Sequence, residues 1–231
     1  TAVLGDPELR AVYLGDDGIL SGAKKGLVAI DCTTVTPKAS AEVAEAAEKL
    51  GVSYIRAPVS GSTVLAERGE LTFIVSGPKS VVDSEMPIFN TLGKSVLYVG
   101  EGEEARVMKL LINMMVAANA LMVGEALTFG EKYNLDWKTM LDVIGGSIVG
   151  NTLIGYKTKP LLNRDFSPAF SIKQMEKDID YALDAAKEVG AFAPMTGLIR
   201  QFLTAAEGLG LGEKDYFSLL LVIEKLSGIN K

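Results

Sequence analysis

Residues 26–51, with the sequence GLVAIDCTTVTPKASAEVAEAAEKLG, change from an apolar run to a helical pattern within one stretch of chain. The run that ends at Asp31 is short and apolar and is followed by a polar turn, which predicts a β-strand. The pair Thr36-Pro37 is typical of the start of a helix, and the helical spacing continues to a stop at Gly51. A strand followed directly by a helix favours an α/β structure here.

The remainder of the first hundred residues repeats this alternation. Three more short runs of β-branched or aromatic residues, each bounded by glycine, predict strands at 52–55, 71–75 and 96–99. Residues 80–92 predict a helix between the last two of these strands. We therefore expect an α/β sheet that ends near Gly102.

From Glu103 onward the spacing of apolar residues is helical, and no strand is predicted. Glu103–Tyr133 predicts one long helix of the kind that links two domains. Typical helix N-caps follow at Asp136, Ser171 and Asp215, with Gln174 completing a capping box behind Ser171, and typical stops follow at Gly190, Gly208 and Gly228. The division is thus an α/β domain over 1–102 and an all-helical domain over 103–231.

Composition excludes several classes of function. The chain has no histidine, which excludes Ser-His-Asp hydrolysis and His-ligated zinc. Cys32 is the single cysteine, so no internal disulfide or cysteine-cluster metal site can form, and we expect no metal and a cytoplasmic location. The net charge of −6 disfavours nucleic-acid binding.

The apolar stretch Leu110–Val123 is interrupted by Asn113 and Asn119 and is shorter than the roughly 20 residues that span a bilayer, so we expect no membrane span.

Polar residues follow two of the predicted strands. After Asp31, Thr33 and Thr34 could face a ligand, because ligands of open α/β sheets bind at the carboxyl ends of strands. The alternative is that these hydroxyls only cap the helix that follows. The segment Arg56–Ser62 follows the next strand, and its small residues let backbone N–H groups approach an anion. The alternative there is an ordinary Gly-Ser loop.

Two further groups of polar residues lie in the helical part. Lys109 and Asn113 are four residues apart, hence on one face of the long helix, among apolar neighbours. A partly desolvated lysine has a lowered pKa and can exchange protons near neutrality, whereas the alternative is a lysine that extends to solvent. The second group predicts a solvated helix face with mutual ion pairs, and it consists of Lys173, Glu176, Lys177 and Asp180.

Taken in order, these motifs resemble those of the β-hydroxyacid dehydrogenase family, which includes 3-hydroxyisobutyrate dehydrogenase, tartronate semialdehyde reductase and the glyoxylate/succinic semialdehyde reductases. The matching motifs are Asp31–Pro37 for Asp-x-Ser-Thr-x-x-Pro, Ala57–Ser62 for Ala-Pro-Val-Ser-Gly-Gly, Gly69–Thr72 for Gly-x-Leu-Thr, Lys109 and Asn113 for Lys-x-x-x-Asn, and Lys177-Asp178 for a Lys-Asp pair. The resemblance covers essentially the whole chain. It implies a Rossmann-type domain, here without its N-terminal part, followed by an all-α 6-phosphogluconate-dehydrogenase-like C-terminal domain.

The resemblance also implies a role for each site residue. Lys109 would be the catalytic acid and base, protonating the alkoxide during carbonyl reduction and accepting the hydroxyl proton during oxidation. The substrate would be bound by Ser60, Gly61, Ser62 and Asn113. The cofactor, NAD or NADP, would be contacted by Thr34, Lys177 and Asp178.

The chain departs from the family pattern at several positions. It begins at Thr1 in what resembles the end of an apolar strand, and we expect the family's Gly-x-Gly-x-x-Gly turn to lie upstream. The segment Gly208–Gly212 cannot replace that turn, because it follows a helical pattern rather than a strand. Ser62 and Leu65 stand where the family has glycines, and either change could narrow the pocket or shift the choice of substrate.

The leading hypothesis is an NAD(P)-dependent oxidoreductase that interconverts a small β-hydroxyacid and its semialdehyde, or reduces glyoxylate or succinic semialdehyde. We expect it to form a homodimer or homotetramer through the helical domain, as relatives commonly do. One alternative is a non-catalytic oligomerisation or binding module of the same fold. The other is an imine reductase, which Lys109 disfavours because the related imine reductases lack this lysine.

Overall fold

The computed structural model describes residues 1–229, apart from the side chain of Val64, and the chain divides into two compact units. The α/β unit comprises Thr1–Ile112 and Tyr181–Ala191. The helical unit comprises Asn113–Asp180 and the chain from Phe192 onward. The limit near Gly102 stays a prediction, and the last two residues of the predicted helical domain, 230–231, lie outside the described residues.

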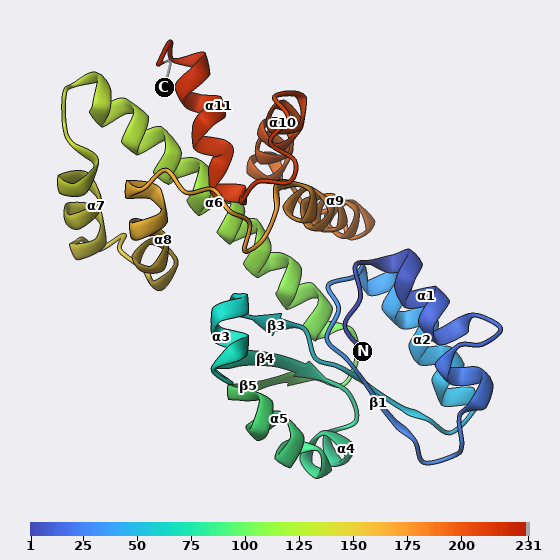
Figure 1. The fold of residues 1–231 in the computed structure, drawn as a ribbon. Helices are drawn as coiled ribbons and strands as arrows, with labels where there is room; N and C mark the ends of the chain where they lie inside the picture. The colour runs from blue at the N-terminus through green and yellow to red at the C-terminus, as the bar shows by residue number, and fades with distance from the viewer. Residues whose placement is uncertain (230–231) are drawn as a thin grey trace. The chain divides into compact units, whose positions relative to one another are not determined.

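A mixed five-stranded sheet forms the centre of the α/β unit (Figure 1). Its strands are β1 (Val28–Asp31), β2 (Ser53–Arg56), β3 (Val59–Ser60), β4 (Leu71–Ser76) and β5 (Gly93–Gly100). Strands β1 and β2 are parallel, β4 runs antiparallel to β2 and β3, and β5 runs parallel to β4. The pairing places Asp31, Arg56, Ser76 and Gly100, the last residues of four strands, in one row across the sheet. We call these four residues the strand-end row.

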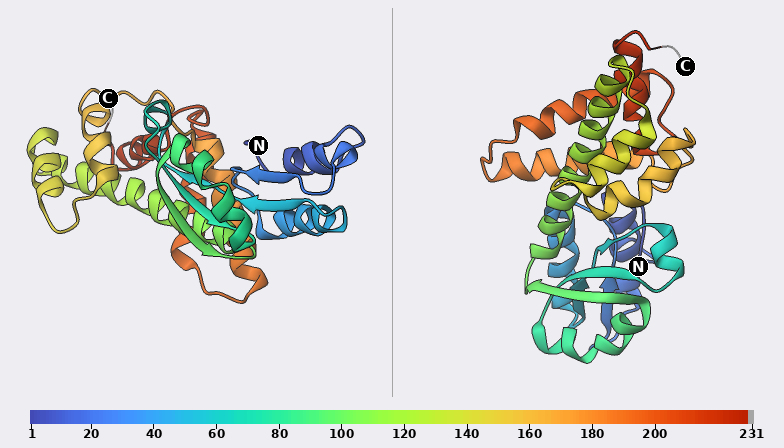
Figure 2. Two further views of the ribbon diagram at one scale, coloured as in Figure 1. Left: turned by 90° about the horizontal axis from the view of Figure 1, so that it is seen from below. Right: turned by 90° about the vertical axis from the view of Figure 1, so that its left-hand side faces the viewer.

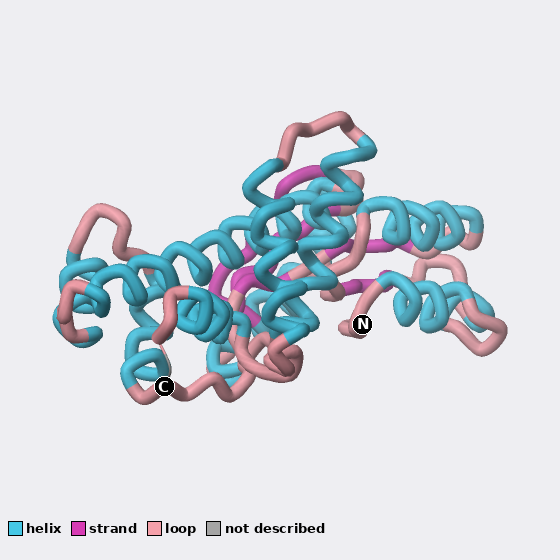
Figure 3. Tube along the Cα trace, turned by 90° about the horizontal axis from the view of Figure 1, so that it is seen from above, coloured by secondary structure: helices cyan, strands magenta, loops and turns pink. Residues whose placement is uncertain are grey.

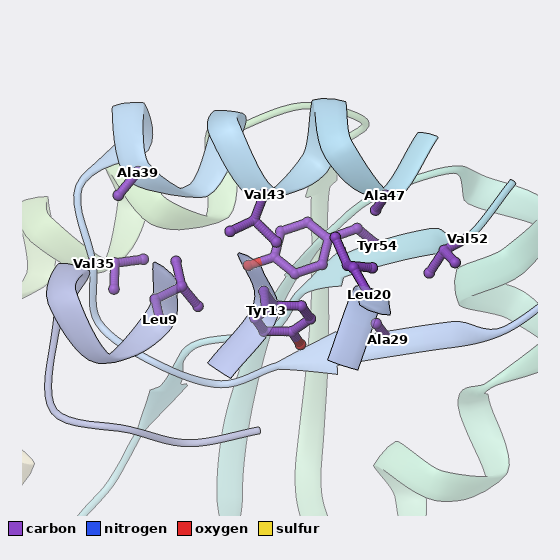
Figure 4. Close-up of a cluster of buried hydrophobic side chains, with 10 residues drawn as sticks. All are labelled: Leu9, Tyr13, Leu20, Ala29, Val35, Ala39, Val43, Ala47, Val52 and Tyr54. Atoms are coloured by element: carbon purple, nitrogen blue, oxygen red, sulfur yellow. The ribbon is translucent and has the colours of Figure 1, made fainter. Parts of the chain in front are cut away.

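Helices cover both faces of this sheet, because successive side chains of a strand point to opposite faces. The helices are α1 (Asp6–Leu14), α2 (Pro37–Lys49), α3 (Thr63–Glu67), α4 (Lys79–Ser84) and α5 (Met86–Leu92), with a 3-10 turn η1 (Ile19–Gly22). On one face, Tyr54 of β2 is buried among side chains of α1 and α2, and its ring packs edge-on against Tyr13 (Figure 4). On the other face, Ile55 of β2 packs with Phe73 of β4 and Phe89 of α5.

The predicted strands at 52–55, 71–75 and 96–99 are confirmed as β2, β4 and β5. The helix predicted over 80–92 is wrong as a single element, because α4 ends at Ser84 and α5 begins at Met86. Pro87 explains the break, since proline has no N–H to donate and its ring clashes with the carbonyl of residue 83 in a continuous helix. Thr1 is assigned to no strand, although its N–H donates to Ile30 O and its carbonyl accepts from Cys32 N.

Residues 103–229 contain no regular strand, as predicted, and Figure 3 shows this part of the chain as helices and loops. The helices are α6 (Glu104–Lys132), α7 (Trp137–Gly146), α8 (Thr152–Leu162), α9 (Ile172–Glu188), α10 (Pro194–Gly208) and α11 (Leu219–Leu226), with a 3-10 turn η2 (Tyr216–Ser218). Helix α6 is one unbroken helix, as the sequence predicted (Figure 2).

The predicted helix ends are confirmed by their hydrogen bonds and backbone angles. Asp136 caps α7 by accepting from Thr139 N, and Asp215 caps η2 by accepting from Phe217 N. Ser171 and Gln174 form the reciprocal capping box of α9. Helix α10 ends at Gly208, and Gly190 and Gly228 follow α9 and α11 with positive φ, where glycine carries no Cβ penalty.

Helix α6 is also more continuously apolar than its two asparagines suggested. By length and composition alone it could cross a membrane, and it is the one such helix among residues 1–229. Core helices of soluble proteins pass the same test, and 39% of the most apolar window is buried inside the protein. The absence of a membrane span therefore stays a prediction.

Candidate active site

Helix α6 starts directly beside the strand-end row of the α/β unit. The Ser76 hydroxyl donates to Gly102 O at 2.7 Å and accepts from Ala105 N at 3.3 Å, which ties the end of β4 to the first turn of α6. The Arg56 guanidinium pairs with the Glu103 carboxylate, with Nε 2.9 Å from Oε1. Two neighbouring strand ends thus hold the residues that begin the helix.

The third attachment is Arg106, whose side chain is completely buried together with that of Asp31. Its Nη2 donates to Asp31 Oδ2 at 2.6 Å and to Tyr54 Oη at 2.9 Å, and its Nη1 donates to Thr33 O at 2.6 Å. Its Nε donates to Ser40 Oγ at 3.1 Å. Burial acts to lower the pKa of Arg106, but the charges of Tyr54 and Asp31 raise it above its ordinary value. The group therefore stays a cation.

The threonines after β1 have three different surroundings. Thr33 is buried, and its hydroxyl donates to Asp31 Oδ1 at 2.8 Å and accepts from Val3 N. Contrary to the expectation, its side chain is therefore not available to a ligand. Helix α2 is capped by Thr36, whose hydroxyl accepts from Ala39 N, so the capping alternative does not hold for Thr33. Thr34 is half-buried and remains the candidate for contact with a ligand.

The predicted substrate loop lies where β3 leads into α3. Ser60 is the second residue of β3 and pairs with Thr72 of β4. The sequence did not predict this short strand. Gly61 has φ +139°, and a Cβ at this position would lie 2.8 Å from the Leu71 side chain and 3.4 Å from that of Leu65. Only glycine fits there, and the backbone of the loop is accordingly exposed at Gly61.

Asn113 is held by an acidic residue from a distant part of the chain. It is buried within the helical unit, and its Nδ2 donates to Asp178 Oδ2 of α9 at 2.5 Å. Because a carboxylate only accepts, this contact fixes which end of the carboxamide faces Asp178 and turns the amide oxygen away from it. Lys109 is half-buried one helical turn earlier on α6. Helical geometry places Lys109 and Asn113 on the same face of that helix.

The charged face of α9 differs from the prediction. Lys177 is half-buried with its Nζ 2.9 Å from Asp178 Oδ1, so the Lys-Asp pair and Asn113 form one connected group. Glu176 and Asp180 pair with Arg200 of α10 rather than with the lysines of their own helix. The pairs expected among Lys173, Glu176, Lys177 and Asp180 are therefore replaced, for the two carboxylates, by pairs with a guanidinium that α10 supplies.

Sequence reasoning missed two features of the site, the role of Arg106 and the partner of Asn113. A signal for Arg106 existed, because a charged residue at a position where helical spacing demands burial needs a partner.

Within residues 1–229, no group of three His, Cys, Asp or Glu side chains could hold a metal ion. Burial raises the pKa of the Cys32 thiol, so it is not an activated nucleophile. A charged hollow of about 570 Å³ between α1, α2 and the end of α9 contains none of the predicted site residues.

Two family models match the chain in succession. Residues 1–100 match the model of the NAD binding domain of 6-phosphogluconate dehydrogenase. Residues 103–223 match the model of the NAD-binding domain of NADP-dependent 3-hydroxyisobutyrate dehydrogenase. The fold is therefore a Rossmann-like domain followed by a helical domain.

Individual relatives point the same way. The chain is 31% identical over 223 residues to 2-(hydroxymethyl)glutarate dehydrogenase from Eubacterium barkeri, covering 96% of this chain and 74% of that protein. It is 27% identical over 221 residues to 2-hydroxy-3-oxopropionate reductase from Escherichia coli, covering 96% and 76%. The solved structure of Mycobacterium tuberculosis 3-hydroxyisobutyrate dehydrogenase with L-serine is 26% identical, with a TM-score of 0.86 and coverage of 96% and 78%.

Proposed function

Because the chain belongs to the β-hydroxyacid dehydrogenase family, we propose that it interconverts a small β-hydroxyacid and its semialdehyde, or reduces glyoxylate or succinic semialdehyde, with Lys109 as acid and base. As a member of this family it is an NAD(P)-dependent oxidoreductase that acts on CH–OH groups. The substrate class follows the names of the relatives. The cytoplasmic location stays a prediction.

The observation that carries the proposal is the fixed orientation of Asn113. Its amide is locked by Asp178 at 2.5 Å, one turn along α6 from Lys109, and both Asn113 and Asp178 are buried. A merely structural asparagine on an apolar helix would need no buried carboxylate, which is costly to desolvate. A substrate oxygen that accepts from Lys109 would lie beside this amide, and Asp178 would keep the amide in place.

In the reducing direction, the Lys109 ammonium stabilises the negative charge that develops on the substrate oxygen and donates a proton to the alkoxide. In the oxidising direction the neutral amine takes the hydroxyl proton. The substrate carboxylate would be bound by the Ser60 hydroxyl and by backbone N–H groups at Gly61 and Ser62. Lysine suits this role because one group supplies both the charge and the proton.

For the cofactor, the described residues fit the nicotinamide end. Thr34 stands half-buried at the carboxyl end of β1, where ligands of α/β sheets bind, and Lys177 is the proposed contact from the helical unit. Within residues 1–229 no strand leads into a Gly-x-Gly-x-x-Gly turn, and Gly208–Gly212 follows helix α10. Bound NADH or NADPH supplies the hydride.

Replacing Lys109 with alanine tests the proposal directly. Loss of a general acid and base typically lowers turnover by about 10²- to 10⁴-fold, and we expect kcat to fall in this range while the Kd for NAD(P)H is unchanged. Lys109→Arg keeps the positive charge but cannot release a proton, so it should be nearly as slow. Lys138→Ala is the matched control, because that lysine is exposed and forms an ion pair with Asp142 on the surface of α7. Unchanged turnover in Lys109→Ala would contradict the assignment.

A substrate panel separates this function from the two alternatives. We expect glyoxylate, succinic semialdehyde or tartronate semialdehyde to be reduced in preference to a cyclic imine. An imine as the best substrate would favour an imine reductase. Cofactor binding without turnover of any substrate, together with stable oligomers, would favour the non-catalytic module.

We also propose self-association through the helical unit, as a homodimer or homotetramer. Met115, Met122 and Phe129 recur every seven residues along α6, Tyr133 directly follows its last residue, and each of the four is more than half exposed. The rings of Phe129 and Tyr133 form an edge-to-face pair at 5.2 Å. Exposed apolar stripes of this kind mark interaction surfaces. Light scattering should show an oligomer that Phe129→Glu dissociates and that Leu50→Glu, on an exposed position of the α/β unit, leaves intact.

A further inference from the structure

The buried guanidinium of Arg106 lies close in sequence to the proposed catalytic lysine. It also makes more hydrogen bonds than a single ion pair would need to hold it. Arg106 and Lys109 are three residues apart on α6, both within the α/β unit. Their side chains therefore leave the helix less than one turn apart. Any rotation or sliding of this part of α6 moves both together.

Arg106 makes five hydrogen bonds to three separate elements of the α/β unit. The acceptors belong to the end of β1 and the turn that follows it (Asp31 O, Asp31 Oδ2 and Thr33 O), to β2 (Tyr54 Oη) and to α2 (Ser40 Oγ). The guanidinium is planar, so acceptors in several directions define both its position and its tilt. A single ion pair to Asp31 would leave the side chain free to rotate about that contact.

A buried ion pair is by itself weak support for stability, because the cost of desolvating two charges can exceed their attraction. An apolar side chain could fill the same volume and hold α6 against the sheet. It could not set the rotation of the helix, since apolar contacts are not directional. The feature that distinguishes Arg106 from an apolar filler is therefore control of orientation.

We propose that Arg106 is a positioning residue that fixes the rotation and axial position of the first turns of α6 and thereby aims the Lys109 ammonium at the substrate. The inference rests on the proposed function, since it acts through Lys109. Ser76 and the Arg56–Glu103 pair fix where α6 begins, and Arg106 fixes which way its face points. A misplacement of the reacting group by about 1 Å can cost on the order of 10²-fold in rate.

The test is Arg106→Lys, which keeps the buried positive charge but loses the planar set of donors. We expect kcat to fall on the order of 10²-fold, while KM for the carbonyl substrate and Kd for NAD(P)H stay within about twofold. Amide hydrogen exchange should quicken over 106–112 and stay unchanged in the rest of α6. Arg10→Lys is the matched control, because Arg10 is a half-exposed guanidinium of the same unit that pairs with Glu42.

A double-mutant cycle shows whether Arg106 acts through Lys109. In the Lys109→Ala background, Arg106→Lys should lower the residual rate no further, because the group that it aims is gone. An equal fall in both backgrounds, or lower thermal stability with unchanged kcat, would overturn the inference while leaving Lys109 as the catalytic residue. Unchanged turnover in Lys109→Ala alone would instead overturn the proposed function, and this inference with it.

If Arg106→Lys does not fold, Tyr54→Phe serves as the milder variant. It removes one acceptor of Arg106 and leaves the volume of the ring in place. We expect a smaller fall in kcat, of about two- to tenfold, again with KM unchanged and again absent in the Lys109→Ala background. A kcat equal to that of the wild type would count against the inference.

Discussion

The α/β unit and the helical unit each bury an ion pair almost completely, and the two pairs are built differently. Arg106 and Asp31 are surrounded by hydroxyl and carbonyl acceptors from three elements. In the other pair it is the lysine that lies among rings: the Lys157 ammonium is 2.7 Å from both oxygens of Asp215 and 5.0 to 5.5 Å from the ring centres of Tyr156, Tyr216 and Phe217.

The difference separates two uses of a buried charge. An ammonium in an aromatic cage attracts its neighbours with little dependence on angle, so Lys157 joins α8 to the loop before η2 without setting a precise orientation. A guanidinium bonded in several directions sets an orientation as well as a contact. The α/β unit uses the directional kind at the start of the helix that carries Lys109, and the helical unit uses the other kind between α8 and the chain before η2.

The largest expected effect comes from removing the acid of each pair. Asp31→Ala and Asp215→Ala each leave a buried cation without its carboxylate, which should lower the free energy of unfolding by about 3–5 kcal/mol. We expect turnover per folded molecule to fall only in Asp31→Ala. Urea unfolding gives the first quantity, and kcat corrected for the folded fraction gives the second. Equal turnover in the two variants would remove the distinction between the pairs.

The next largest effect comes from close packing, which differs between two helical positions of the helical unit. A Cβ at Gly124 of α6 would lie 3.2 Å from Leu220 Cα and 3.1 Å from Ile223 Cδ1 of α11. Gly124→Ala should therefore destabilise by about 1–3 kcal/mol. Gly197→Ala in α10 meets nothing within 4 Å and should stabilise by about 0.5–1 kcal/mol through helix propensity. Thermal unfolding should show shifts of opposite sign; a stabilising shift in Gly124→Ala would mean that packing at Gly124 is not limiting.

A smaller loss of stability is expected when a helix cap is removed, and each unit offers one cap for comparison. The Thr36 hydroxyl accepts from Ala39 N and also donates to Asp6 Oδ2 at 2.6 Å, joining α2 to α1. The Ser171 hydroxyl accepts from Gln174 N at 3.2 Å and, within residues 1–229, joins no second helix. Thr36→Ala should cost about 2 kcal/mol and Ser171→Ala about 1 kcal/mol. Chemical denaturation measures both, and the reverse order would show that the bond to Asp6 contributes little.

The smallest effect depends on pH. The hydrogen bonds from Thr139 lower the pKa of Asp136 below its ordinary value. A carboxylate with a depressed folded-state pKa contributes stability above its unfolded pKa of about 3.9, and this contribution is lost as pH falls through the folded-state pKa. Wild type should therefore exceed Asp136→Asn in stability at neutral pH, and the gap should close on acidification. A gap that stays constant with pH would contradict this account.

Local chemistry explains the parts of the fold that could be predicted. Thr36 and Pro37 begin α2 because the hydroxyl satisfies an N–H of the first turn and the proline ring is preset for a helix. Gly51 stops it with a positive φ. The single helix predicted over 80–92 is interrupted because Pro87 lacks the N–H that a continuous helix needs, a constraint that apolar spacing does not carry.

The candidate site was predictable only in part, because some of its contacts join residues that are far apart in the sequence. Lys109 and Asn113 share a helix face through local geometry, so their spacing was sufficient to associate them. Asp178 lies 65 residues beyond Asn113, and Arg106 lies 75 residues beyond Asp31. Contacts over such separations depend on how whole elements pack, which periodicity and capping patterns do not encode.

The sequence by itself determined strands β1, β2, β4 and β5, the caps, the length of α6 and the residues capable of the proposed acid–base chemistry, because each of these depends on neighbours a few positions away. Only the tertiary structure decided that Thr33 is structural, that Asp178 orients Asn113 and that Arg106 anchors α6 to the strand-end row. Those outcomes depend on which buried polar groups meet. Because an unpaired buried charge is too costly to leave, the packing of the elements selects the partners.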